Sequence, residues 1–342
     1  MSRSPLPTAV PATASPLEPP DADSFASFAP GFGQRVLLTV DTEEEFVWNG
    51  TFSRDGFGLS HVSQIARFQE FCEGLGANPL YLVDWPIVND GLAVEIIGDA
   101  VRRGVAEVGV QLHPWVNPPF EEVLSVHNSF AGNLAPALEA AKLMALRDRI
   151  EQAFGTAPLS YRAGRYGLGP HTTALLRHAG IMVDTSVRAL YDYSHSGGPD
   201  YSHFPLIPYW ADRERAVLEV PVTSVYRGAL SRAGSRLRKM ERHVPSLLAG
   251  FSRLGLIERI GLTPEGTTIA EGLRGIGKAV DMGLPVLVLT FHSPSLSPGH
   301  TPWVETVAEV EGLYCWFAAV YGELARRGVA STTIAEIIAA AR

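Results

Sequence analysis

The stretch VLLTVDTE, residues 36–43, places a run of mainly apolar residues directly before two carboxylates, Asp41 and Glu43. Its length and its β-branched residues predict a buried strand of a parallel sheet, because such strands are covered on both faces and read as continuous apolar runs. Three further predicted strands run directly into an ionisable residue: residues 105–112 into His113, 159–161 into Arg162 and 285–291 into His292. Ionisable side chains thus follow predicted strands four times.

The segments between these strands have a helical period. Residues 61–75 carry apolar side chains at helical spacing and close at glycines, so they form a βα unit with the first strand. Further strands are predicted at residues 79–83, 181–183 and 218–222, further helices at 88–103, 136–154, 171–178, 303–327 and 332–341, and a long loop at 187–216. About seven such units favour a closed or nearly closed parallel barrel. A doubly wound open sheet is the alternative that the pattern leaves open.

The position of the ionisable residues predicts where a site lies. In a parallel barrel the carboxyl ends of all strands lie on one face, where active sites are assembled from the loops that follow. Two carboxylates, two imidazoles and an arginine can meet there. Such a set suits metal-assisted hydrolysis: a divalent ion held by imidazole and carboxylate activates a water, a second carboxylate accepts its proton, and a distant histidine protonates the leaving group.

Composition limits the classes of protein to which this chain can belong. Of its 342 residues 46% are hydrophobic, and 28 Lys and Arg against 36 Asp and Glu give a net charge of −8. The apolar fraction excludes global disorder, and net acidity argues against a nucleic-acid partner. No apolar run approaches the roughly 18–20 residues of a transmembrane segment. Two isolated cysteines, Cys72 and Cys315, are typical of a reducing compartment, so we expect a soluble, cytoplasmic protein.

Two segments differ from the rest in composition. Residues 1–32 are rich in proline, alanine and serine and are expected to form a disordered N-terminal tail, so the barrel domain is predicted to span residues 33–342. Residues 227–242 concentrate basic side chains against a single acid, Glu241. One interpretation is that this basic stretch is a solvated helix face. The alternative is that it binds a phosphate-bearing or lipid-linked carrier of the substrate.

Four segments at the predicted strand ends have the order and spacing of a known family. They are LTVDTE at residues 38–43, QLHPW at 111–115, YRAGRYG at 161–167 and LTFHSP at 289–294. In this respect the chain resembles the polysaccharide deacetylases of the NodB-homology type, carbohydrate esterase family four, and most closely their divergent WalW-like branch. The resemblance implies an α/β fold, the distorted (β/α)7 barrel. It also implies a metal-dependent removal of acetyl groups from N-acetylated sugars, with Zn²⁺ as the divalent ion.

The resemblance implies catalytic and metal-binding roles for individual residues. The family's general base is the first Asp after the first strand, here Asp41. Arg162 corresponds to the arginine that orients this base, and His292 to the general acid. The implied metal ligands are Glu43, which replaces the family's Asp at Thr42, then His113 and Asn117, which stands at the spacing of the family's second histidine; His127 is the alternative third ligand.

Further residues are expected beside this set. Trp115, Arg165 and Tyr166 are expected to bind substrate, with Arg165 either pairing with Glu43 or recognising a substrate anion. Asp184, at the end of a predicted strand, is expected to hold His292 in its productive tautomer. The two acids that follow Glu43, Glu44 and Glu45, are expected to be solvated.

The leading hypothesis is therefore a metal-dependent hydrolase that removes N-acetyl groups from a sugar or glycan intermediate of cell-surface polysaccharide biosynthesis. Two alternatives stay open. Because Thr42 and Asn117 depart from the family's ligand set, the chain can instead be a metal-poor, non-catalytic relative that binds glycan. The second alternative is a C–N hydrolase that acts on a small amide, since a fold alone does not determine the substrate.

Overall fold

A curled sheet of nine strands forms the centre of the structure, a computed structural model that describes residues 15–48, 50–228 and 257–342. The strands are β1 (Arg35–Thr42), β2 (Leu80–Val83), β3 (Glu107–Leu112), β4 (Ser160–Ala163), β5 (Val183–Asp184), β6 (Tyr209–Trp210), β7 (Leu218–Glu219), β10 (Val286–His292) and β11 (Ala330–Ser331). Their order is β10-β1-β2-β3-β4-β5-β7-β6, and β11 pairs with the start of β1. From β10 to β7 every pair in this order is parallel, and only β6, at the edge, is antiparallel.

The ring of strands is closed by single hydrogen bonds rather than by a ladder. Between β7 and β10 lies a separate antiparallel pair, β8 (Ser224–Arg227) and β9 (Glu258–Gly261). Leu262 donates its backbone N–H to Thr223 O (3.2 Å) and accepts from Thr290 N (3.1 Å), so it links the two edges. The strand order is sequential and does not reverse as it does in a doubly wound sheet. The distorted (β/α)7 barrel predicted from the sequence is thereby confirmed.

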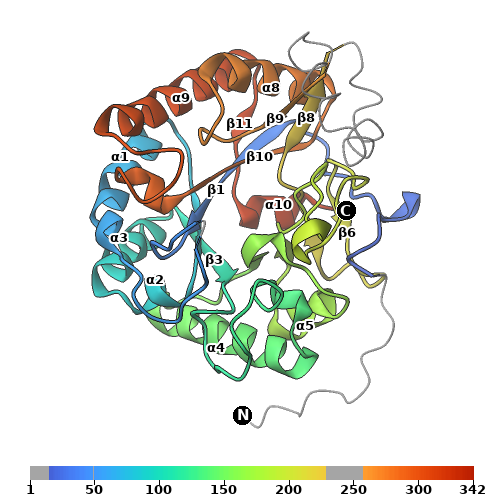
Figure 1. Ribbon diagram of the computed structural model, residues 1–342. Helices are drawn as coiled ribbons and strands as arrows, with labels where there is room; N and C mark the ends of the chain where they lie inside the picture. Colours follow the sequence, from blue (N-terminus) through green and yellow to red (C-terminus); the bar gives the residue numbers. More distant parts are fainter. Residues whose placement is uncertain (1–14, 49, 229–256) are drawn as a thin grey trace.

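Helices cover the outer face of this barrel (Figure 1). They are α1 (Ile65–Gly74), α2 (Trp85–Asn89), α3 (Gly91–Arg102), α4 (Pro136–Phe154), α5 (Thr172–Ala179), α8 (Ile269–Asp281), α9 (Val307–Arg326) and α10 (Ile334–Ala340). Short 3-10 turns precede or follow several of them, among them η2 (Ser60–Gln64), η4 (Gly164–Tyr166) and η7 (Ser293–Leu296). The strands are packed against helices on the outer face and against other side chains in the barrel interior. Because both faces are buried, the strands are continuously apolar.

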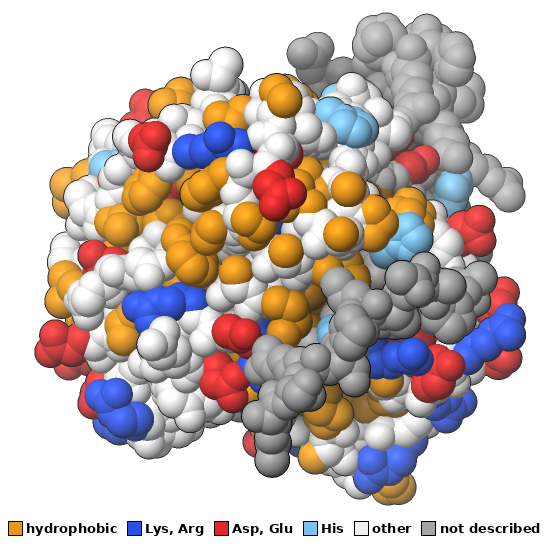
Figure 2. All heavy atoms as spheres, turned by 90° about the horizontal axis from the view of Figure 1, so that it is seen from below, with side chains coloured by type: hydrophobic (Ala, Val, Ile, Leu, Met, Phe, Trp, Pro, Cys, Tyr) orange, Lys and Arg blue, Asp and Glu red, His pale blue; other side chains and the backbone are white. Residues whose placement is uncertain are grey.

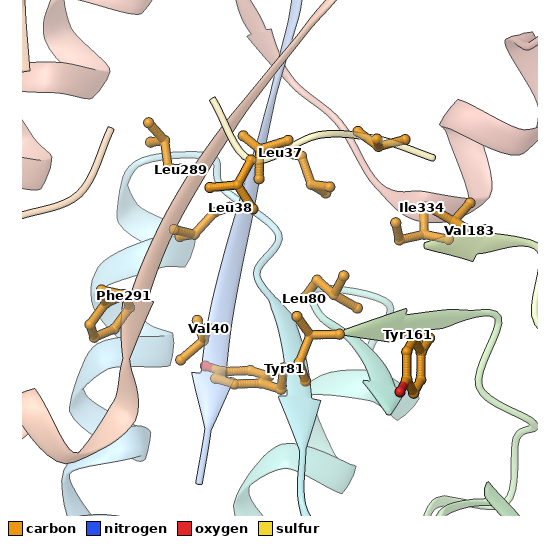
Figure 3. Close-up of a cluster of buried hydrophobic side chains, with 14 of the residues drawn as sticks. Leu37, Leu38, Val40, Leu80, Tyr81, Tyr161, Val183, Leu289, Phe291 and Ile334 are labelled. Atoms are coloured by element: carbon orange, nitrogen blue, oxygen red, sulfur yellow. The ribbon is translucent and has the colours of Figure 1, made fainter. Parts of the chain in front are cut away.

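Figure 3 shows part of the hydrophobic core, which lies between β1, β2, β4, β5 and β10. Seven of the eight residues of β1 are buried, as are six of the seven of β10. The side chains that fill this region come from five strands and from α10; those labelled in Figure 3 are Leu37, Leu38, Val40, Leu80, Tyr81, Tyr161, Val183, Leu289, Phe291 and Ile334. Burial of both faces fixes β1, the strand that carries Asp41, at the centre of the sheet.

Two predicted helices differ from those observed. The helix expected at residues 61–75 begins as the 3-10 turn η2, and the one expected at 88–103 is divided into α2 and α3. The division has a physical cause. The side chains of Asp84 and Asp90 each accept the backbone N–H of the residue three positions later, so each of them caps the start of a helix.

Helix α8 and the β8–β9 pair were not predicted from the sequence. Three glycines within α8 weaken its helical signal. The structure explains two of them by close packing: a Cβ at Gly272 would lie 2.8 Å from Trp316 Nε1, and one at Gly275 would lie 2.9 Å from Ile260 Cγ2. These glycines let α8 approach α9 and β9.

The segment expected to be a disordered tail makes contacts where it is described. Ala26 N donates to Pro208 O (3.0 Å), and Ala29 N donates to Ala340 O (2.8 Å). Ser27 and Arg342 exchange two backbone hydrogen bonds, of 3.3 and 2.8 Å. At these residues the segment differs from the expected disordered tail, because its backbone is hydrogen-bonded to residues 340 and 342 near the end of the chain. The domain boundary at residue 33 stays a prediction.

Two further expectations concern other parts of the chain. Most of the basic stretch at residues 227–242 lies outside the described residues. Among the helices of the described chain, none combines the length and the apolar character that crossing a bilayer requires.

Candidate functional site

A cavity of about 290 Å³ opens at the carboxyl ends of β1, β3, β4 and β10. The ionisable residues predicted from the strand ends all line it, together with residues that the sequence did not single out. Its polar lining comprises Asp41, Glu43, Gln111, His113, Arg162, Arg165, Arg188 and His292, and its aromatic lining includes Trp48, Trp115, Tyr166, Tyr193 and Trp303. The structure therefore brings the residues at these strand ends to one cavity.

The surface around the cavity also carries apolar side chains. The loops after β1 and β3 expose Val47, Phe120, Val123 and Val126. On the face seen in Figure 2, hydrophobic side chains gather in a band across the middle of the molecule. On this face of the protein, charged side chains are therefore surrounded in part by apolar ones.

Asp41 and Arg162 form a fully buried ion pair at the base of the cavity. One amino group of the guanidinium, Nη1, donates to Asp41 Oδ1 and to Thr290 Oγ1, the latter at 2.9 Å. The other N–H groups bond to Thr39 Oγ1 and to the hydroxyl and carbonyl of Thr185, at 3.0 to 3.1 Å. All five guanidinium donors are used, so Arg162 holds Asp41 in one orientation.

His292 lies beside Asp41 because the register of β1 and β10 pairs these two residues. Its Nε2 is 3.7 Å from Asp41 Oδ2. On the other side of the ring, Nδ1 is 2.7 Å from Glu265 Oε2, and Glu265 also accepts the His292 backbone N–H. The imidazole stacks on Trp303 with 5.5 Å between ring centroids.

The charges around His292 favour its protonated form. Burial on its own lowers the pKa of His292, but the charge of Glu265, the hydrogen bond to it and the charge of Asp41 outweigh burial. The pKa is therefore raised above its ordinary value. A histidine in this state can donate a proton from Nε2 while Glu265 accepts from Nδ1.

His113 is buried and neutral. Burial lowers the pKa of His113 to about 4, against the charges of Asp84 and Asp41, which act to raise it. Its Nδ1 lies 3.0 Å from Glu44 Oε2, and its Nε2 lies 3.4 Å from Glu43 Oε2. With Nδ1–H donating to Glu44, the free Nε2 lone pair faces Glu43.

A buried group of Glu44, Asp84 and His113 has ligand atoms within 4.8 Å of one another. Both carboxylates already have hydrogen-bond donors. Glu44 accepts from Trp115 Nε1 (2.6 Å), and Asp84 accepts the backbone N–H groups of Glu44 and Ile87, each at 2.9 Å. Neither acid lines the cavity, so we interpret this group as the support that orients His113.

Glu43, Gln111 and His113 fit a divalent cation better. Gln111 Nε2 donates to Glu43 Oε2 (2.9 Å), whereas Glu43 Oε1 and Gln111 Oε1 are buried and have no hydrogen-bond partner. Burial, and after it the charges of Asp41 and three other carboxylates, raises the pKa of Glu43 well above its ordinary value. Two unsatisfied oxygens and a free imidazole nitrogen in an acidic site are the donor set that such an ion requires.

The two candidates for the third ligand lie elsewhere. Asn117 is buried but does not line the cavity; its Nδ2 donates to Lys142 O (2.9 Å) and to Pro118 O (2.7 Å). His127 is exposed, and its backbone carbonyl accepts from Asn133 Nδ2 (2.9 Å). Neither residue lines the cavity, but Asn117 Oδ1 is buried without a hydrogen-bond partner, so a ligand role for Asn117 stays a prediction. The backbone N–H of Asn117 donates to His113 O (3.1 Å), so the two residues are one turn apart although prolines stand at positions 114 and 118.

The predicted substrate-binding residues do line the cavity. Trp115 is 2% exposed, stacks on His113 with ring centroids 4.2 Å apart, and is held by Glu44 through its indole N–H. Tyr166 is also buried, and its ring lies 5.7 Å from that of Tyr193. Arg165 packs over Phe130, with its Cζ 4.1 Å from the ring centroid.

Asp184 does not contact His292. Its Oδ1 accepts from the backbone N–H and the hydroxyl of Ser186 at 3.0 and 2.5 Å. Burial raises the pKa of Asp184 to about 7. The contact with His292 expected of Asp184 is made by Glu265, which the sequence analysis missed because it follows β9, a strand that was not predicted.

Three further acids lie near the site: Glu44 and Glu45, which were expected to be solvated, and Asp84, for which no role was predicted. Glu44 was expected to be solvated but is buried, because it receives hydrogen bonds from Trp115 and His113. Asp84 follows a predicted strand directly, so the strand-end rule could have found it. The third, Glu45, accepts from His61 Nδ1 (2.9 Å), and His61 Nε2 reaches Ser293 Oγ at 2.9 Å, which ties the loop after β1 to that after β10.

Comparison with known proteins gives the fold. No family model matches the chain, and no curated protein matches it in sequence. A probable polysaccharide deacetylase from Pseudomonas aeruginosa PAO1 is similar in structure with a TM-score of 0.50 and 12% identity, over 91% of this chain and 91% of that one. The fold is the NodB-type distorted barrel.

Other solved structures share this architecture. The 4-alpha-glucanotransferase from Thermococcus litoralis is similar with a TM-score of 0.53 and 13% identity, over 90% of this chain but only 40% of that one. PuuE allantoinase has a TM-score of 0.48 and 13% identity, over 90% of each chain. At these identities the similarity concerns the fold alone, and the chemistry must be argued from the cavity.

Proposed function

We propose that the protein is a metal-dependent hydrolase that removes the acetyl group from an N-acetylated sugar. The observation that carries the proposal is the pairing of Asp41 and His292 across 3.7 Å at the same cavity that holds Glu43 and His113. A base, an acid and a cation-binding set within one cavity are what amide hydrolysis requires.

Asp41 is the proposed general base. Arg162 occupies its Oδ1, which leaves Oδ2 on the side of His292 and the cavity. The oxygen that remains can take a proton from an attacking water, while the guanidinium keeps the carboxylate in place.

His292 is the proposed general acid. Glu265 accepts from Nδ1, so the proton that the leaving nitrogen needs is the second one, which Nε2 carries when His292 is protonated. Because the pKa of His292 is raised, this proton is present over a wider pH range than in an ordinary histidine.

Glu43, His113 and Gln111 are the proposed ligands of a divalent ion, with Zn²⁺ the ion expected from a set of imidazole nitrogen and carboxylate and amide oxygens. When bound, such an ion polarises the acyl carbonyl and lowers the pKa of a water. The unsatisfied oxygens of Glu43 and Gln111 support this assignment. Asn117 is left out of the set because it does not line the cavity.

The finer parts of the hypothesis are proposals that rest on the resemblance of the sequence motifs. They are a role in cell-surface polysaccharide biosynthesis, a cytoplasmic location and a sugar rather than a small amide as substrate. The volume of the cavity, about 290 Å³, favours one sugar ring or a compact amide over a buried polymer segment.

The test measures acetate release and bound metal on the same preparations. Wild-type protein is assayed with N-acetylated chito-oligosaccharides as purified, after chelation, and after addition of Zn²⁺. We expect His113→Ala to lose both metal and activity, and Asp41→Asn to keep metal but lose activity by about 100-fold or more. His178→Ala, which alters an exposed histidine on α5, is the matched control.

Full acetate release in excess chelator would contradict the metal dependence. A metal-loaded wild type that hydrolyses no amide would contradict the catalytic role and favour the glycan-binding alternative. Hydrolysis of a small cyclic amide but of no sugar would reassign the substrate and leave the site chemistry unchanged.

A further inference from the structure

Two arginines of the cavity have no carboxylate partner among the residues that the structure describes. Arg162 is neutralised by Asp41, whereas Arg165 and Arg188 line the same cavity and neither pairs with an acid within the described chain. Arg165 belongs to the turn η4 after β4, and Arg188 follows β5. They come from two neighbouring strands and converge on one space.

Arg188 is held by aromatic groups. Its Cζ lies 4.0 Å from the centroid of Tyr191 and 5.3 Å from that of Tyr166, and its Nη1 is 3.3 Å from Tyr193 Oη. Its Nε is buried and has no hydrogen-bond partner. Ring faces position a guanidinium and attract it, but they do not neutralise its charge or use its in-plane donors.

Arg165 is presented from an uncommon backbone conformation. Its φ is 57°, in the left-handed region that a non-glycine residue rarely adopts, and the next residue, Tyr166, has a φ of 60°. The guanidinium packs between Phe130 and Phe52, with Cζ 4.1 and 5.2 Å from their centroids, and Nη1 donates to Ser129 Oγ at 2.5 Å. Strain of this kind persists where the surrounding structure fixes it, and functional sites are the usual place.

Both arginines are half-buried, so each guanidinium has lost part of its hydration without gaining a carboxylate among the described residues, and a ligand of opposite charge would compensate for this loss. The planar donors of arginine match the paired oxygens of a carboxylate or a phosphate. The two guanidinium groups also line the same cavity as Asp41, His113 and His292. Both arginines are therefore close to the reaction centre.

We propose that Arg165 and Arg188 bind an anionic group, a carboxylate or a phosphate, on the same small molecule whose N-acetyl group the site hydrolyses. This inference rests on the proposed function and narrows its substrate class from N-acetylated sugars in general to anionic ones. Because the cavity measures about 290 Å³, the anion and the amide must lie on one ring or on adjacent groups.

Three probes with the same N-acetylated ring distinguish the possibilities: N-acetylglucosamine is neutral, N-acetylmuramic acid carries a carboxylate, and N-acetylglucosamine 6-phosphate carries a phosphate. Their binding to the full chain with the Asp41→Asn substitution is measured by calorimetry, so that no turnover occurs. We expect at least one anionic probe to bind tenfold or more tightly than the neutral one. The tighter anion identifies the source of the charge.

Variants assign the effect to the two residues. Arg165→Gln and Arg188→Gln should each weaken binding of the anionic probe by about 10- to 100-fold and leave the neutral probe unchanged, because a hydrogen bond to a charged group is lost. Arg188→Lys retains the charge but not the paired donors and should fall between. Arg102→Gln, on the exposed side of α3, is the matched control.

The proposal would be overturned if the Asp41→Asn protein, in which both arginines are present, bound all three probes with equal affinity. This comparison does not require any arginine variant to fold. Equal losses for neutral and anionic probes in the glutamine variants would also overturn it, since a structural role alone would produce them. Acetate release separates the two claims: anion-selective binding without hydrolysis refutes the proposed function only, and hydrolysis without charge selectivity refutes this inference only.

Discussion

At the scale of single residues, the site is organised by buried charges that alternate in sign. Arg162 holds Asp41, Asp41 faces His292, and His292 is held by Glu265. The charges of Glu265 and Asp41 both favour protonated His292, so removing either one lowers the pKa of this histidine and can also change its position.

Glu265→Gln tests this coupling. The amide can still accept from His292 Nδ1 but lacks the negative charge that raises the pKa of His292, so that pKa should fall. Activity that needs protonated His292 is present below its pKa and is lost as pH rises through it. We therefore expect the alkaline limb of kcat/KM to move to lower pH, with a loss at high pH of up to about 100-fold and little change at low pH.

The measurement is a pH profile of kcat/KM for acetate release, with Glu305→Gln, an exposed acid in the loop before α9, as the control. Superimposable profiles for wild type and Glu265→Gln would contradict the assignment of His292 as the acid. Loss of activity by the same factor at every pH would indicate a structural effect instead.

The sequence predicts the residues that follow strongly apolar strands and misses those that do not. Asp41, His113, Arg162 and His292 were found because each ends such a strand. Gln111 was missed as a candidate ligand because it is uncharged and lies within β3. Which oxygen of a carboxylate lacks a donor is decided by three-dimensional neighbours, so the unsatisfied atoms of Glu43 and Gln111 could not be read from the sequence.

At the scale of elements, the turn after β4 supports the end of β3. A Cβ on Gly164 would lie 2.6 Å from both Leu112 O and His113 Cδ2. Neither atom can move freely, since Leu112 lies in β3 and His113 is held by Glu44. Glycine is required at this position by the close approach of the turn to His113.

Gly164→Ala should therefore displace His113 and lower both stability and metal content. We expect a decrease of about 1–3 kcal/mol in the free energy of unfolding, measured by urea denaturation, because overpacking forces backbone shifts of this cost. Gly74→Ala is the matched control, since nothing lies within 4 Å of a Cβ there and Gly74 is within α1. A Gly164→Ala protein with unchanged stability and metal content would show that the contact is not restrictive.

One helix with clear start and stop signals, α4, was predicted to the residue, whereas elements shaped by tertiary contacts were not. Helix α4 begins at Pro136 and ends before Gly155 in a left-handed conformation, and its predicted and observed bounds agree. Helix α8 was missed because Gly272 and Gly275 lower its local propensity, although packing against Trp316 and Ile260 requires them. Tertiary contacts overrode the local signal there.

At the scale of the whole molecule, the two ends of the described chain are joined. Residues 26–29 form four backbone hydrogen bonds, one to Pro208 and three to residues 340–342. This arrangement was not apparent from the composition of residues 1–32, because a proline-rich segment with few apolar residues is typical of disorder. The sequential order of the barrel, by comparison, follows directly from the alternation of strands and helices.

Deletion of residues 1–30 should destabilise the protein. Loss of four hydrogen bonds, each with a net contribution of about 0.5–1.5 kcal/mol, predicts a decrease of about 2–6 kcal/mol in the free energy of unfolding. Deletion of residues 1–14 is the matched control, since it removes none of these bonds. Equal stability of the two truncated proteins in urea would show that residues 15–30 contribute nothing and would support the boundary at residue 33.

The central place of β1 has a consequence for how the protein is made. The strand is synthesised first, yet two of its three partner strands, β10 and β11, begin only at Val286 and Ala330. At about 5–20 residues per second, the ribosome needs on the order of tens of seconds to reach them. Throughout that time β1 presents an open apolar edge, the kind of surface that templates incorrect pairing between nascent chains. The same delay keeps Asp41 without His292, so the reaction centre cannot form before translation is nearly complete.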